Sequence, residues 1–91
     1  MKSAIQINVK GSVQGVLYRA SAVEIAEKLK VTGYVRNLED GSVELYAEGE
    51  KEKLEQFRDW CMKGPKGARV DDVNFEWLDA MGQFDKFMIK R

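Results

Sequence analysis

Two glycines and an arginine within residues 11–19 are the residue types in this chain best suited to chemistry. Gly11 and Gly15 lie between an alternating apolar pattern and a helical one, and Arg19 stands where the helical pattern begins. Glycine lets main-chain N–H groups approach a ligand closely, and a helix N-terminus adds unpaired donors and a partial positive charge. The planar guanidinium of Arg19 matches two oxygens of a phosphate or carboxylate. The stretch therefore predicts an oxyanion-binding loop; the alternative is a glycine-containing turn followed by a surface arginine.

The spacing of these glycines does not match the common nucleotide-binding loops. The phosphate loop of nucleotide hydrolases needs a second glycine followed directly by lysine and Ser or Thr. Here Gly15 is followed by Val16 and Leu17, and the third glycine of the dinucleotide motif is missing as well. We therefore expect no nucleotide cofactor, and no other cofactor is predicted.

Charge is distributed unevenly along the chain. The 15 basic and 15 acidic residues give a net charge of zero, which argues against nucleic-acid and membrane partners. The first acidic residue is Glu24, so residues 1–23 carry Lys2, Lys10 and Arg19 unopposed. Positive potential is thus concentrated around the glycine loop. A small anionic molecule is the expected partner.

Size and composition narrow the possible chemistry. A chain of 91 residues predicts a single domain over residues 1–91, expected to be a monomer. The chain has one cysteine, Cys61, and no histidine, so it lacks the commonest general base and the commonest metal ligand. No metal site is predicted. No apolar run approaches the length of a membrane span or signal peptide core, so we expect a soluble cytoplasmic protein.

Apolar periodicity predicts strands and helices in a simple order. Period-two alternation indicates strands near residues 5–9, 34–37, 43–47, 73–77 and 87–89, and helical spacing indicates helices near 22–29 and 50–62. The start of the first helix stays open, either at a capping box of Ser21 and Glu24 or nearer Arg19. The order predicts a ferredoxin-like α+β sandwich, β-α-β-β-α-β, with a four- to five-stranded antiparallel sheet and two helices on one face.

Two long motifs resemble the acylphosphatase family. The first is Gly-x-Val-Gln-Gly-Val-x-aromatic-Arg, seen here as Gly11-Ser12-Val13-Gln14-Gly15-Val16-Leu17-Tyr18-Arg19. The second begins with Gly33-Tyr34-Val35-Arg36-Asn37 and continues through Gly41-Ser42-Val43 to Gly49. The resemblance extends over nearly the whole chain and implies the same ferredoxin-like fold.

The resemblance implies hydrolysis of a carboxyl–phosphate anhydride to a carboxylate and inorganic phosphate, the latter being both product and inhibitor. It implies that Arg19 binds the phosphate group and that Asn37 orients the attacking water. Main-chain amides of the loop would complete the phosphate cradle, from residues Gln14, Gly15, Val16, Leu17, Tyr18 and Arg19. From the residues alone, Asn37 could instead be a strand-end residue that satisfies the following turn.

Two positions depart from the family pattern. Leu38 follows the asparagine where many members have threonine, so a hydroxyl near the site is missing. Tyr18 replaces the common phenylalanine, and its hydroxyl needs a hydrogen-bond partner.

The remaining chemically notable residues are expected to be structural. Cys61 falls on the apolar face of the second helix with no base nearby, which favours a buried hydrophobic role over a nucleophile. The aromatic rings of Trp60, Phe75 and Trp77 are expected in the core or at its edge.

Three other functions compete with a stand-alone hydrolase. A non-catalytic anion-binding or regulatory module could use the same fold, but Arg19 and Asn37 are both intact. An RNA-binding domain needs exposed aromatic residues on its central strands, and the first strand offers Ile5, Ile7 and Val9 instead. An acylphosphatase-like domain of a larger maturation enzyme is the third, and the length of the chain favours the stand-alone protein.

Overall fold

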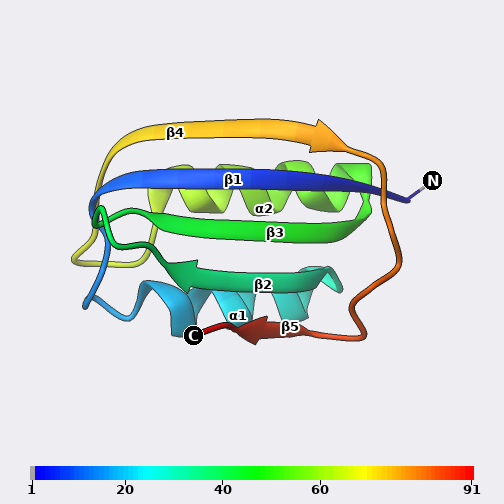
Figure 1. Cartoon of the computed structure of the whole chain (residues 1–91), viewed down its shortest axis with the longest axis horizontal. Helices are drawn as coiled ribbons and strands as arrows, with labels where there is room; N and C mark the ends of the chain where they lie inside the picture. The colour runs from blue at the N-terminus through cyan, green and yellow to red at the C-terminus, as the bar shows by residue number, and fades with distance from the viewer. Residues whose placement is uncertain (1) are drawn as a thin grey trace.

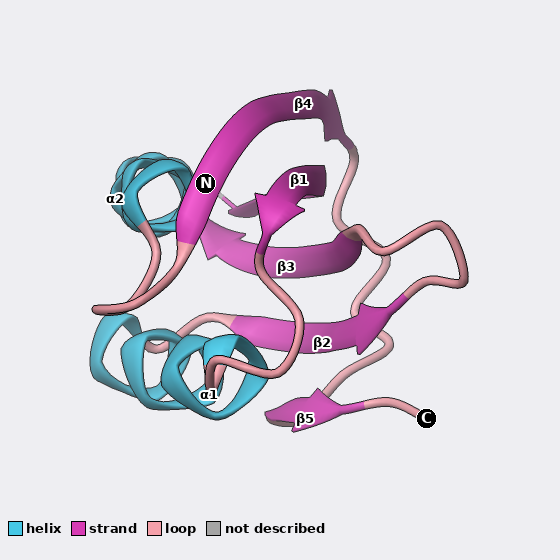
Figure 2. Ribbon diagram, turned by 90° about the vertical axis from the view of Figure 1, so that its left-hand side faces the viewer, coloured by secondary structure: helices cyan, strands magenta, loops and turns pink. Residues whose placement is uncertain are grey.

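A computed structural model of the chain describes residues 2–91. Its elements follow the order that periodicity predicts: β1 (Lys2–Ser12), α1 (Tyr18–Leu29), β2 (Thr32–Asn37), β3 (Val43–Glu50), α2 (Lys51–Lys63), β4 (Arg69–Leu78) and β5 (Phe87–Ile89). Figure 1 shows both helices behind a single sheet, and Figure 2 shows them side by side on one face of it. The ferredoxin-like α+β fold is confirmed.

The sheet has the strand order β4-β1-β3-β2-β5. β1 pairs antiparallel with β3 and β4, and β2 pairs antiparallel with β3. β5 instead runs parallel to β2, so the expectation of a wholly antiparallel sheet is wrong at this edge. The reason is the path of the chain after β4, which crosses to the opposite edge along the end of the sheet where β2 begins (Figure 1). β5 therefore enters the sheet in the direction of β2.

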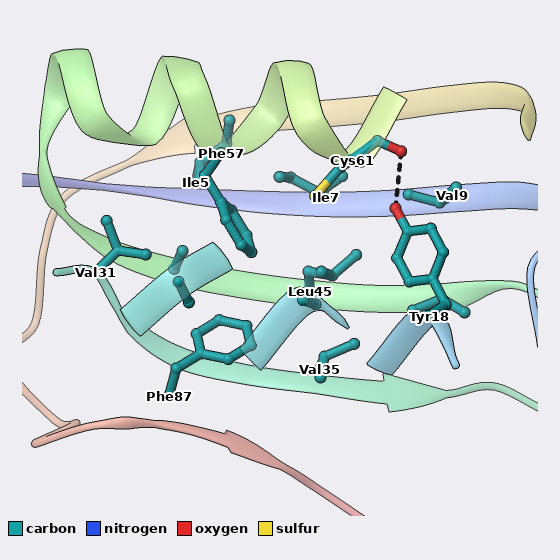
Figure 3. Packing of buried hydrophobic residues seen from close by; sticks show 14 of the residues in the cluster. Ile5, Ile7, Val9, Tyr18, Val31, Val35, Leu45, Phe57, Cys61 and Phe87 are labelled. Carbon is teal, nitrogen blue, oxygen red and sulfur yellow. Dashed lines mark hydrogen bonds between the residues drawn. The ribbon is translucent and has the colours of Figure 1, made fainter. Parts of the chain in front are cut away.

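The core lies between the helices and the sheet face that they cover. Alternate residues of β1 point into it, as their period-two pattern predicts, and Ile5, Ile7 and Val9 are fully buried. Phe57 of α2 meets Phe87 of β5 with ring centres 5.4 Å apart, which ties the C-terminal strand into the core (Figure 3). The domain thus buries one continuous apolar layer.

The aromatic side chains near the β4 edge have different environments. Trp60 and Trp77 are half-buried against the core, as expected. Phe75 is 44% exposed, so of its two expected places, the core and the core's edge, the first is wrong. Its ring is covered by the guanidinium of Arg58, 5.1 Å from the ring centre, because α2 presents a charged residue to this edge strand.

The connection between β4 and β5 is held to the helix-free face of the sheet by a buried carboxylate. Glu48 is 5% exposed and accepts hydrogen bonds from the Tyr46 hydroxyl at 2.6 Å and from the main-chain N–H of Met81 at 2.8 Å and of Gly82 at 3.2 Å. The ring of Phe84 packs 5.7 Å from that of Tyr46. Burial acts to raise the pKa of Glu48, but these hydrogen bonds outweigh it and hold the pKa below its ordinary value.

A lowered native pKa makes Glu48 a source of stability that depends on pH. The contribution is complete above the ordinary carboxyl pKa of 4.5 and is lost as the pH falls through the lower native value. Glu48→Gln should therefore lower the melting temperature at pH 7, and the difference from the unmodified protein should shrink below pH 4.5. Thermal unfolding across this pH range measures it, with Glu76→Gln on the same sheet face as control. A difference that stays constant with pH would contradict the assignment.

Candidate active site

The loop between β1 and α1 has an unusual main-chain conformation. Gly15 has a φ of 77° and Leu17 a φ of 63°, both in the left-handed region. Such conformations curl the main chain into concavities whose N–H groups can bind anions. The conformation is easy for glycine but costs a leucine about 1 kcal/mol. The Leu17 side chain is 76% exposed, so core packing does not compensate for that cost.

The first turn of α1 keeps its N-terminal donors free. The helix begins at Tyr18, and the N–H of Ser21 donates to the carbonyl of Leu17 at 3.0 Å, so Ser21 already lies inside the helix. Of the two expected starts, the one near Arg19 is confirmed and the capping box is wrong. Within this fully described helix, no side chain caps the N-terminus and no acidic residue lies in the first turn. An anion at this end would meet both free donors and the positive end of the helix dipole.

Tyr18 anchors the end of this loop in the core. Its side chain is 1% exposed, its ring centre lies 5.2 Å from that of Trp60, and its hydroxyl donates to the main-chain carbonyl of Cys61 at 2.7 Å (Figure 3). That carbonyl belongs to the last turn of α2, and Pro65, four residues on, has no N–H to offer it. The Tyr18 hydroxyl therefore has a hydrogen-bond partner, and the Cys61 carbonyl gains the donor that the helix end does not supply.

Cys61 itself is a packed core residue, as the sequence predicts. Its side chain is fully buried, and burial raises the pKa of the thiol above its ordinary value. A thiol that resists ionisation is a poor nucleophile.

Arg19 and Asn37 meet in one pocket, although they come from different elements. The pocket has a volume of about 210 Å³ and is lined by Val13, Gly15, Leu17, Tyr18, Arg19, Ala20, Asn37 and Ile89. Arg19 lies in the first turn of α1 and Asn37 at the end of β2. Gln14 and Val16, expected to contribute main-chain amides, are not among the lining residues.

Asn37 carries an unsatisfied acceptor. Its Oδ1 is buried and has no hydrogen-bond partner, whereas most buried polar atoms in proteins are paired. The turn after β2 is closed by other groups: Asp40 Oδ1 accepts from the main-chain N–H of Ser42 at 2.9 Å and from its hydroxyl at 2.6 Å. The turn therefore does not depend on Oδ1 of Asn37, and this oxygen can accept a hydrogen bond from a bound molecule.

The charge in the pocket comes from Arg19. The other arginine near this end of β2, Arg36, is paired with Glu44, with Nε 2.6 Å from Oε1. Among residues 2–91, no carboxylate forms an ion pair with Arg19. The same residues contain no cluster of three potential metal-binding side chains. Within them, neither helix combines the length and apolar character of a membrane span.

The family model described as Acylphosphatase matches residues 5–89. The chain is 45% identical over 87 residues to an acylphosphatase of Methylococcus capsulatus, covering 96% of this chain and 95% of that protein. The chain belongs to the acylphosphatase family. The enzyme class that the two motifs imply is therefore confirmed.

Solved acylphosphatase structures share the whole fold. The acylphosphatase from Bacillus subtilis superposes with a TM-score of 0.94 at 32% identity, covering 100% of both chains. That from Coxiella burnetii gives a TM-score of 0.91 at 37% identity, covering 98% of this chain and 93% of the other. The five-stranded mixed sheet and its two helices are thus the acylphosphatase arrangement.

Three lining residues were not predicted from the sequence: Val13, Ala20 and Ile89. Val13 and Ala20 lie directly beside the predicted loop, whereas Ile89 comes from a distant segment of the chain. Ile89 of β5 forms part of the pocket wall. The apolar pattern predicts a strand at residues 87–89, but a pattern does not reveal the strand's neighbour. Only the parallel pairing with β2 brings Ile89, opposite Val35 in register, to the end of the sheet that holds Asn37.

Tyr18→Phe should test the anchoring hydrogen bond. Loss of the hydroxyl leaves the Cys61 carbonyl buried without a donor, so the free energy of unfolding should fall by about 1–3 kcal/mol. Urea unfolding measures the change, with Tyr34→Phe, whose hydroxyl is only partly buried, as the matched control. An unchanged unfolding free energy for Tyr18→Phe would show that the bond adds nothing.

Proposed function

We propose that this chain hydrolyses acyl phosphates, with Arg19 and loop amides binding the phosphate group and Asn37 orienting the attacking water. The observation that carries the proposal is the buried, unpartnered Oδ1 of Asn37, which lines the same pocket as Arg19. Membership of the acylphosphatase family supports the reaction, and the pocket supports the division of roles. The products are a carboxylate and inorganic phosphate.

Phosphate binding is assigned to groups that all offer hydrogen-bond donors. The guanidinium of Arg19 supplies a fork of N–H groups, and the uncapped first turn of α1 supplies main-chain donors. Together with the left-handed turns at Gly15 and Leu17, they suit a group with several oxygens. During phosphoryl transfer the equatorial oxygens share the negative charge, so these fixed donors stabilise the transition state.

Asn37 is assigned to the water because its free atom is an acceptor. A carboxamide oxygen accepts a hydrogen bond from water but does not take its proton near neutral pH. The water attacks phosphorus, the bond from phosphorus to the acyl oxygen breaks, and its electron pair leaves with the carboxylate. The proton of the water passes to a phosphate oxygen of the substrate. No histidine is required for this sequence.

An acyl phosphate suits such a site because the substrate is already activated. Its carboxylate is a good leaving group, so positioning and charge stabilisation are sufficient. We propose that the enzyme works without metal or cofactor, as a cytoplasmic monomer, and that inorganic phosphate inhibits it by occupying the cradle. The alternative of a non-catalytic anion-binding module makes a different prediction, namely phosphate binding without phosphate release from benzoyl phosphate.

Arg19→Gln should raise the KM for acyl phosphate and the Ki for inorganic phosphate together. The same fork contacts both, and its loss should cost on the order of 2–4 kcal/mol of transition-state stabilisation. Phosphate release from benzoyl phosphate measures the effect. Arg69→Gln serves as the control, because that arginine pairs with Asp71 on the exposed part of β4. Wild-type kinetics in folded Arg19→Gln would remove Arg19 from the site.

Asn37→Ala should separate catalysis from phosphate binding. We expect kcat to fall by on the order of 100-fold while the Ki for phosphate stays close to wild type, because the lost contact is made to water. kcat and kcat/KM should fall together. Circular dichroism must first establish that the variant is folded. If kcat is retained and phosphate affinity is lost, Asn37 is a phosphate ligand and its proposed role is wrong.

A further inference from the structure

The side chain of Gln14 joins the phosphate loop to the hairpin that carries Asn37. Its Nε2 donates one hydrogen bond to the carbonyl of Leu38 and another to the carbonyl of Ser42, both at 2.8 Å. Leu38 directly follows Asn37, and Ser42 directly precedes Val43, the residue that pairs with Asn37 across the hairpin. One side-chain amide therefore binds both the residue after Asn37 and the residue before its partner across the hairpin.

The chemistry of the acceptors fixes the orientation of this amide. Both partners are main-chain carbonyls, which only accept hydrogen bonds, so the NH₂ end of Gln14 must face them. Both of its N–H groups are then used. No carboxylate or hydroxyl side chain of similar size could supply two donors to the same pair of oxygens.

The two carbonyls are also the ones that shape the hairpin loop. The N–H of Leu38 donates to the carbonyl of Ser42 at 2.9 Å, and the N–H of Gly41 donates to the carbonyl of Leu38 at 3.2 Å. Gln14 adds a second donor to each oxygen from outside the hairpin. The Gln14 side chain thereby connects the loop before α1 to the two residues that close the hairpin turn, Leu38 and Ser42.

We propose that the Gln14 side chain is a positioning group that sets Asn37, and hence the attacking water, at a fixed distance from the phosphate cradle. This inference rests on the proposed role of Asn37. Both N–H groups of the Gln14 side chain are bound to hairpin carbonyls, so the side chain acts through Asn37 and not on the substrate. Hydrolysis needs the water and the phosphorus held in line, and a displacement of about 1 Å can cost about 100-fold in rate.

The test replaces the amide by a side chain of similar length without donors. Gln14→Met keeps the main-chain N–H of residue 14 and removes both hydrogen bonds, and Gln56→Met makes the same change on the exposed surface of α2. We expect Gln14→Met to lower kcat by about 10- to 100-fold and to change the Ki for phosphate by less than about twofold. Gln56→Met should leave both constants unchanged.

A double variant distinguishes positioning from a merely structural role. In an Asn37→Ala background, Gln14→Met should lower kcat by less than about twofold, because the group that it positions is already gone. An equal fall in both backgrounds would overturn the inference, as would a kcat matching that of Gln56→Met or a raised phosphate Ki with unchanged kcat. Failure of the proposed function is seen separately, as wild-type kcat in Asn37→Ala alone.

Hydrogen exchange in the unmodified protein keeps the inference testable if Gln14→Met does not fold. Both side-chain amide protons of Gln14 should exchange at least about tenfold more slowly than those of exposed Gln56, because both are held in hydrogen bonds. NMR measures the two rates. Exchange as fast as that of Gln56 would show that the link between loop and hairpin does not form.

Discussion

Burial of Tyr18 is the constraint from which the geometry of the site follows. The ring occupies the space between the start of α1 and the end of α2, and its hydroxyl supplies the donor that Pro65 cannot give to the carbonyl of Cys61. The neighbouring chain is adapted to it. Gly64 has a φ of 73°, and a Cβ there would lie 3.2 Å from the Tyr18 ring. Because Tyr18 is fixed in the core, it also holds the main chain of the next residue, Arg19, in place.

The loop between β1 and α1 is held near both of its ends. Tyr18 fixes the helix end through the core, and Gln14 fixes the strand end through the hairpin. Between them, Leu17 remains in a left-handed conformation with an exposed side chain, and α1 lacks the cap that would stabilise it. A serine or aspartate cap would use the donors that an anion needs. Helix stability is thus given up at an end whose N–H groups stay free.

The sequence was sufficient for features with a local cause and insufficient for those that depend on distant partners. Alternation of Ile5, Ile7 and Val9 predicted a strand with one buried face. The two motifs predicted that Arg19 and Asn37 belong to one site, and the structure places both in one pocket. The capping box at Ser21 failed because the N-cap is the left-handed Leu17, four residues earlier. The prediction that β5 is antiparallel failed because the direction of this strand depends on the route of the preceding connection. That route is held by Glu48 and has no sequence pattern of its own.

Because Ile89 of β5 forms part of the pocket wall, the order in which the strands assemble determines when the pocket is complete. Gly15 and Ile89 are far apart in the chain, and the two sides of the pocket meet only after β5 has joined the sheet. Bringing together segments so far apart in the chain is entropically costly and comes late in folding. A nascent or partly folded chain therefore carries Arg19 without an enclosed pocket around it. A ligand that needs the complete pocket binds only the native state and shifts the folding equilibrium toward it.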